Sequence, residues 1–163
     1  MIRICGLKVE NMTSPMGIGA SCPRFSWRSE SDIADFVQKS YRIKLYEQDK
    51  CLWDSNVVES PESLNITGCP RLRACRQYSW QVTITDQNGN TCTSERAFFE
   101  TGMLHKKWKA LWIAGIHNGD VKQPVNYLRK GFELSKPVVS ARLYSTALGV
   151  YECFLNGKKV SED

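Results

Sequence analysis

Apolar and polar residues alternate one by one along short segments of this chain, and this period of two restricts its fold more than any other feature. In residues 78–84 every second residue is large and apolar, and the residues between them are Ser, Gln and Thr. The pair Asn88-Gly89 then supplies a tight hairpin turn, and residues 91–101 return as the partner strand. No segment shows the helical period of 3.6. The sequence therefore predicts an all-β chain of antiparallel strands.

The first hundred residues contain enough strand segments for one complete sandwich. The predicted strands are residues 3–9, 23–28, 39–47, 51–54, 63–67, 77–85 and 92–100. This number and spacing are typical of a fibronectin type III/immunoglobulin-like antiparallel β-sandwich, in which Trp27 and Trp80 would be core rings from opposite sheets. Leu72 followed by Tyr78 resembles a tyrosine corner. The cysteine pair of antibody domains is missing from the expected strands, which favours the fibronectin-like variant.

A second β region follows a boundary that we place near Gly102, so that the domains are 1–103 and 104–163. Residues 104–112 form a basic, aromatic connector. Further strands are expected at 127–134, 138–146 and 149–155, and the last one ends in the hairpin signal Asn156-Gly157. These resemble the first strands of a second, jelly-roll-like β-sandwich, which three strands cannot complete.

The composition is that of a folded, soluble protein, with 42% hydrophobic residues, 24% charged residues and a mean hydropathy of −0.38. No apolar run approaches the roughly 20 residues of a membrane span, and the first residues lack the apolar core of a secretory signal. We therefore expect no membrane contact and a cytoplasmic location. The cysteines have neither CxxC spacing nor suitably spaced histidines, so we expect reduced thiols and no metal. They are Cys5, Cys22, Cys51, Cys69, Cys75, Cys92 and Cys153.

The net charge of +5 arises entirely in the last third of the chain. Residues 1–103 carry 12 Lys and Arg against 12 Asp and Glu, and residues 104–163 carry 10 against 5. The cations of the second part are scattered among apolar strand residues, and no nucleic-acid-binding module is recognisable. We therefore expect no nucleic-acid partner.

No arrangement of residues in the sequence indicates a catalytic site. The carboxylates Asp54, Glu100 and Glu152 occur singly, as do His105 and His117, so we interpret them as structural or solvated groups. Neither a GxSxG motif, a glycine-rich phosphate loop nor a calcium loop is present. We expect no catalytic residue and no cofactor.

Short motifs, spread over essentially the whole chain, carry a resemblance to one family. In chain order they are LKVEN (7–11), PMGI (15–18), PRFSW (23–27), YRI (41–43), LWDS (52–55), YSW (78–80), FETG (99–102), WI (112–113), LRKGF (128–132), ARLYSTALGVYE (141–152) and LNG (155–157). They resemble the N-terminal region of bacterial α-L-rhamnosidases of glycoside hydrolase family 78. The match covers the first, fibronectin-like domain of these enzymes and the start of the second.

The resemblance implies a function for the parent enzyme rather than for these residues. Enzymes of this family hydrolyse terminal α-L-rhamnosides with inversion, which requires an acid and a base about 6.5–9.5 Å apart. In the family both groups belong to an (α/α)₆ barrel that lies downstream. The chain is therefore expected to be a non-catalytic accessory region, inactive alone, whose partner is the rest of the parent enzyme.

Two features leave other functions open. Trp53, Trp108 and Trp112 lie near turns, where they could stack on a sugar ring or pack one domain against the next. A carbohydrate-binding module and a fibronectin-like interaction module are therefore alternatives. The uncovered apolar faces of the incomplete second sandwich could also pair with a second copy of the chain, pack on the first domain or remain disordered. Of these three we expect self-association.

Overall fold

A computed structural model describes residues 2–115 and 125–160 of the chain. The chain divides into two compact units, Met1–Leu111 and Trp112–Asp163. His117 lies outside the described residues. No helix with the length and apolarity of a membrane span occurs in the described ranges.

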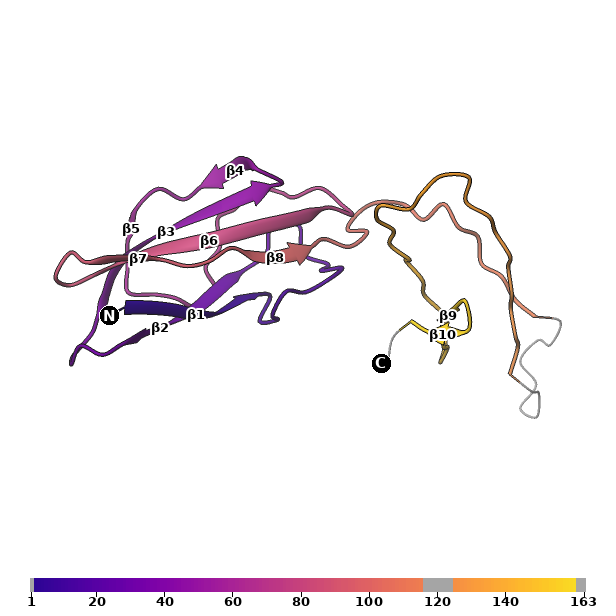
Figure 1. Cartoon of the computed structure of the whole chain (residues 1–163), viewed down its shortest axis with the longest axis horizontal. Helices are drawn as coiled ribbons and strands as arrows, with labels where there is room; N and C mark the ends of the chain where they lie inside the picture. The colour runs from indigo at the N-terminus through magenta and orange to yellow at the C-terminus, as the bar shows by residue number, and fades with distance from the viewer. Residues whose placement is uncertain (1, 116–124, 161–163) are drawn as a thin grey trace. The chain divides into compact units, whose positions relative to one another are not determined.

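The first unit is an antiparallel β-sandwich of two layers (Figure 1). Its strands are β1 (Ile2–Val9), β2 (Phe25–Ser31), β3 (Gln38–Glu47), β4 (Lys50–Asp54), β5 (Val58–Glu59), β6 (Gln77–Asp86), β7 (Thr91–Thr93) and β8 (Ala97–Glu100). Strands β1 and β2 form the smaller sheet. The larger sheet has the order β4-β3-β6-β7, with β5 paired to β3 and β8 paired to β6. The all-β, immunoglobulin-like fold predicted from the sequence is confirmed.

The inward faces of the two sheets share one aromatic core, as the alternation predicted. Trp27 on β2 and Trp80 on β6 are both almost fully buried, so the prediction of core rings from opposite sheets is confirmed. The rings of Phe25 and Trp80 meet across the layers with centroids 4.8 Å apart, and Trp27 meets Tyr41 edge-on at 5.3 Å. Burying rings of this size supplies much of the hydrophobic stabilisation of such a sandwich.

The predicted tyrosine corner is present at the start of β6. The backbone N–H of Arg73 donates to the hydroxyl oxygen of Tyr78 over 3.0 Å, and the ring of Tyr78 stacks on Phe99 at a centroid distance of 5.6 Å. Leu72, next to Arg73, is buried in the same core. This contact fixes the crossover chain that leads into β6.

The hairpin predicted at Asn88-Gly89 is also present, and a buried carboxylate organises it. The Asp86 side chain accepts hydrogen bonds from the backbone N–H groups of Asn88 and Asn90, at 2.9 and 2.8 Å. Gly89 adopts a φ of 84°, which a glycine accommodates without steric cost. Strand β7 then pairs with β6.

Two strand predictions in the first unit were wrong in detail. The expected strand 92–100 is divided, because the Ser94 hydroxyl accepts the N–H of Val82 at 3.1 Å in place of a backbone carbonyl and so interrupts the ladder. The expected strand 63–67 is not a strand. This segment is instead held by single backbone contacts to β2, in which Phe25 pairs with Ile66 and the N–H of Trp27 donates to the carbonyl of Ser63.

The second unit contains one short hairpin, formed by β9 (Phe154–Leu155) and β10 (Lys158–Lys159). Its turn residues Asn156 and Gly157 both have positive φ, as a tight hairpin turn requires, so this prediction is confirmed. The strands expected at 127–134 and 138–146 are not formed, and the strand expected at 149–155 is reduced to its last two residues. An alternating sequence specifies a face, but a strand also needs a neighbour for its backbone groups.

Candidate functional site

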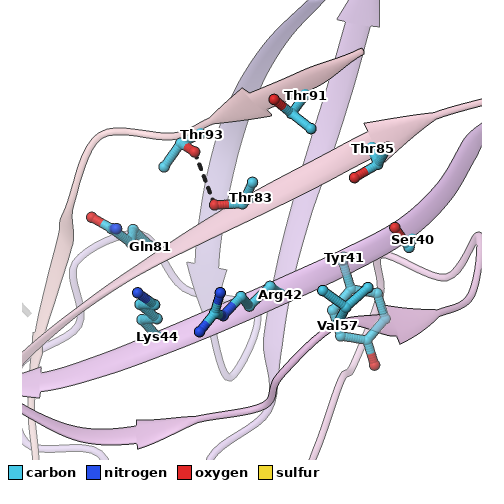
Figure 2. A pocket seen from close by; sticks show the side chains of 10 residues that line it. All are labelled: Ser40, Tyr41, Arg42, Lys44, Val57, Gln81, Thr83, Thr85, Thr91 and Thr93. Atoms are coloured by element: carbon cyan, nitrogen blue, oxygen red, sulfur yellow. Dashed lines mark hydrogen bonds between the residues drawn. The ribbon is translucent and has the colours of Figure 1, made fainter. Parts of the chain in front are cut away.

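The outward face of the larger sheet is a polar surface with a shallow hollow of about 350 Å³ (Figure 2). Alternate residues of β3, β6 and β7 supply most of it, because the opposite set of side chains, to which Tyr41 belongs, is buried in the core. Its lining residues are Ser40, Tyr41, Arg42, Lys44, Val57, Gln81, Thr83, Thr85, Thr91 and Thr93. The hydroxyls of the four threonines, one amide and two cations are at least partly exposed to solvent on this face, whereas Ser40 and Tyr41 are buried beneath it.

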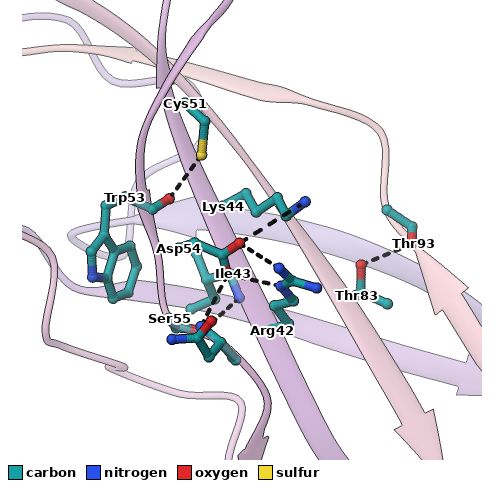
Figure 3. Close-up of polar contacts among 10 residues, drawn as sticks. Arg42, Ile43, Lys44, Cys51, Trp53, Asp54, Ser55, Thr83 and Thr93 are labelled. Atoms are coloured by element: carbon teal, nitrogen blue, oxygen red, sulfur yellow. Dashed lines mark hydrogen bonds and ion pairs between the residues drawn. The ribbon is translucent and has the colours of Figure 1, made fainter.

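The charges of this face are organised by Asp54, at the end of β4 (Figure 3). The Arg42 guanidinium donates two hydrogen bonds to its carboxylate, at 2.8 and 2.6 Å, and the Lys44 ammonium lies 4.0 Å away. The hydrogen bonds from Arg42, reinforced by the backbone N–H of Asn56, hold the pKa of Asp54 below its usual value. A carboxylate held ionised in this way positions cations and is poorly suited to act as a general acid.

The hydroxyl groups of the face are partly paired with each other. The Thr83 and Thr93 hydroxyls on β6 and β7 are 2.8 Å apart, a cross-strand hydrogen bond that Figures 2 and 3 both show. Such a face can exchange hydrogen bonds with a polar surface, but it presents neither an activated nucleophile nor an acid–base pair.

A second hollow, of about 500 Å³, lies beside the tyrosine corner. It is lined by Glu47, Lys50, Leu52, Pro70, Arg71, Leu72, Arg73 and Tyr78. The Glu47 carboxylate forms an ion pair with Arg73, and the Arg76 guanidinium lies 3.8 Å from it. The charge of the Glu47 carboxylate is therefore balanced by these two arginines.

The other carboxylates singled out in the sequence are Glu100 and Glu152, one in each unit. Glu152 pairs with Lys159 at 3.0 Å within the second unit. Glu100 is half-buried on β8, and its backbone N–H donates to the Pro15 carbonyl. His105 is exposed. Within residues 2–115 and 125–160, no three His, Cys, Asp or Glu side chains gather as metal ligands would.

The three tryptophans proposed for sugar contact have different environments. Trp53 is half-buried on β4 and packs against the core of the first unit. Trp108 and Trp112 expose 46% and 66% of their surface. Trp108 belongs to the first unit and Trp112 to the second. Sugar contact by any of the three stays a prediction.

Sequence reasoning missed the role of the FETG motif, which ends the first sandwich. The buried Thr101 hydroxyl donates to the carbonyl of Arg73 at 2.7 Å and accepts the backbone N–H of Arg76 at 3.1 Å. Gly102 approaches the chain so closely that an added Cβ would lie 2.7 Å from the Gly17 carbonyl oxygen. The motif therefore fixes the exit of the chain, and its occurrence at the end of the last strand was the available signal.

Comparison with known families agrees with this arrangement. The family described as the Rha78A-like, N-terminal immunoglobulin domain matches residues 4–105, and the α-L-rhamnosidase N-terminal domain matches residues 136–163. The chain belongs to the N-terminal region of the α-L-rhamnosidase family. The first match covers the sandwich, and the second begins within the unit whose strands are mostly unformed.

Individual α-L-rhamnosidases show the same relationship. An α-L-rhamnosidase of Formosa agariphila is 35% identical over 94% of this chain, and one of an Alteromonas species is 32% identical over 95% of it. The crystal structure of Streptomyces avermitilis α-L-rhamnosidase complexed with L-rhamnose is 28% identical and covers 70% of the chain, with a TM-score of 0.66.

The chain spans less than a fifth of the length of these relatives. It covers 18% of the Formosa protein, 19% of the Alteromonas protein and 12% of the Streptomyces chain in the crystal structure. The similarity therefore concerns one N-terminal part of much larger enzymes.

Proposed function

We propose that this chain is the non-catalytic accessory region of an enzyme that hydrolyses terminal α-L-rhamnosides with inversion. The observation that carries the proposal is the match of the N-terminal rhamnosidase domains to 4–105 and 136–163, in family order. The rest of the parent enzyme, including its catalytic barrel, would be the natural partner of the chain.

The electrostatics of the described residues support a non-catalytic role. Inverting hydrolysis needs one carboxyl group with a raised pKa as acid and one free carboxylate as base. Asp54 and Glu10 instead have pKa values lowered by Arg42 and Arg24, which bind them through paired hydrogen bonds. Carboxylates that are held ionised and paired with arginine stabilise the sandwich and are poorly suited to act as the acid or the base of a hydrolysis.

The proposal is tested by comparing the chain alone with the same chain joined to its catalytic remainder. Each is incubated with an aryl α-L-rhamnoside, and release of the aryl group is measured. We expect release only from the longer protein. Release by the purified chain alone, in proportion to its concentration, would overturn the proposal and indicate a site outside the described residues.

Sugar contact is a second role that the exposed rings favour. The Streptomyces relative is described in complex with L-rhamnose, and Trp108 and Trp112 offer accessible indole faces of the kind that stack on sugars. Titration of L-rhamnose against intrinsic fluorescence tests the idea, with Trp108→Ala and Trp112→Ala as variants. A signal that persists in both variants would assign the contact elsewhere.

Self-association of the isolated chain is part of the same proposal. The second unit exposes large apolar side chains that a complete sandwich would cover, among them Val139 and Val150, which are essentially fully exposed. Leaving one such side chain in water forgoes roughly 1.5–3 kcal/mol. In the parent enzyme the remainder of the chain would cover these residues, and in the isolated chain a second copy would do so.

A cytoplasmic location completes the proposal. All seven cysteines are free thiols in the structure, which fits a reducing compartment.

A further inference from the structure

Two of the free cysteines lie on neighbouring segments of the first sandwich that are far apart in sequence. Cys22 is exposed on the segment that leads into β2, and Cys69 is buried on the long crossover between β5 and β6. Neither segment is part of a regular sheet at these positions, so backbone pairing within a sheet does not explain why they run together.

Backbone hydrogen bonds hold the two segments together on both sides of the cysteines. Phe25 and Ile66 exchange two bonds, of 2.9 and 2.8 Å, and the N–H of Leu72 donates to the carbonyl of Ser21 at 2.8 Å. The segments therefore run antiparallel. The register shifts by two residues between the two contacts, and Cys22 and Cys69 lie between them, on facing stretches of the two segments.

The Cys69 side chain confirms that the segments meet at this point. Its thiol is directed at the carbonyl oxygen of Pro23, the residue after Cys22, with the sulfur 3.8 Å from that oxygen. Burial raises the pKa of Cys69 to about 12, and the nearby Cys22 thiol contributes to the rise. Cys69 therefore faces the backbone beside Cys22, and a disulfide forms when the Cα atoms of two such residues come within about 4.4–6.8 Å.

We propose that Cys22 and Cys69 form a reversible disulfide when the protein meets a small-molecule disulfide such as oxidised glutathione. The Cys22 thiolate attacks one glutathione sulfur and releases the first reduced glutathione. Cys69 then gives up its proton and attacks the Cys22 sulfur, which releases the second. Two protein thiols are oxidised, one glutathione disulfide is reduced to two thiols, and the two protein protons end on glutathione.

The exposure of the two thiols sets the order of these steps. Exposed Cys22 is accessible to the oxidant, whereas Cys69 is buried and reacts only with a sulfur delivered beside it. The bond would tie the crossover to the segment before β2, and that crossover carries Pro70, Arg71 and Leu72 into the wall of the second hollow. Oxidation would therefore stiffen this wall. The inference is independent of the proposed rhamnosidase role.

The link is sought by treating the reduced chain with oxidised glutathione, blocking the remaining thiols with N-ethylmaleimide and mapping tryptic peptides without reduction. The peptide that carries Cys69, residues 51–71, also carries Cys51, so Cys51→Ser serves as the background. We expect peptide 9–24 joined to peptide 51–71 in this background. Oxidation should also raise the melting temperature by about 5–10 °C, and dithiothreitol should reverse the rise.

Cys22→Ser is the decisive variant, because Cys22 is exposed and its replacement should leave the fold intact. It should lose both the linked peptides and the rise in melting temperature, whereas Cys51→Ser should keep both. Stable glutathionylation of Cys22 without a link, links among other cysteines or the absence of any oxidation would each overturn the proposal.

Discussion

The Thr101 hydroxyl donates a hydrogen bond to the backbone carbonyl of Arg73 across 2.7 Å, and it thereby connects the end of β8 to the crossover before β6. The same oxygen accepts the N–H of Arg76. Arg73 also binds the Tyr78 hydroxyl through its own N–H. The Thr101 hydroxyl and the Tyr78 hydroxyl thus both bind the backbone of Arg73 in the crossover, and these bonds close this end of the sandwich.

Replacing Thr101 with valine should therefore destabilise the first sandwich. The change keeps the side-chain shape, removes the hydroxyl and leaves a buried N–H and a carbonyl unsatisfied, so we expect the free energy of unfolding to fall by about 1–3 kcal/mol. Urea unfolding measures this fall in the free energy of unfolding. Thr91→Val is the matched control, because Thr91 is exposed on β7, and it should stay within about 0.5 kcal/mol of the wild type. Equal effects would mean that the buried hydroxyl of Thr101 stabilises the fold no more than an exposed one.

Gly102→Ala should be destabilising for a steric reason. The added Cβ would lie 2.7 Å from the Gly17 carbonyl oxygen, so the backbone must shift, at a cost of about 1–3 kcal/mol. Gly19→Ala is the control, since a Cβ added there would meet no atom within 4 Å and the φ of Gly19 is not positive. Thermal unfolding of the two variants would contradict this account if Gly19→Ala proved the more damaging.

Acid should weaken the first sandwich through Asp86. Hydrogen bonds, first from the Asn90 side chain and then from backbone N–H groups, lower the pKa of Asp86 in the folded state. Its contribution is therefore complete above the unfolded pKa of about 3.9 and is lost as the pH falls through the lower, folded value. Asp86→Asn should flatten the acid limb of a plot of unfolding free energy against pH. An unchanged acid limb in this variant would assign the pH dependence to other groups.

The isolated chain should self-associate through its second unit. We expect light scattering to report a mass above the 18.6 kDa of one chain, because the apolar side chains of residues 125–160 are exposed. Val139→Lys combined with Val150→Lys should reduce the association, and Val57→Lys, a change at an exposed valine of the first unit, should not. A monodisperse wild-type monomer in which residues 125–160 resist protease would contradict the prediction.

The sequence by itself determined the features that depend on neighbours along the chain. The alternation in residues 78–84 specified the large apolar side chains of β6 that are buried in the core, and the Asn-Gly pairs specified both hairpins, because strand faces and tight turns follow from local backbone geometry. The tyrosine corner was recognisable for the same reason, since Arg73 and Tyr78 are close in sequence.

The tertiary structure decided every feature that depends on residues distant in sequence. The break at Ser94, the lock between Thr101 and Arg73 and the approach of Cys69 to the segment of Cys22 involve chain segments brought together only by folding. Residues 127–134 show the opposite case. Their sequence has the pattern of a strand, but the described structure gives them no partner strand. A side-chain pattern is local, whereas a strand is completed by hydrogen bonds to another segment.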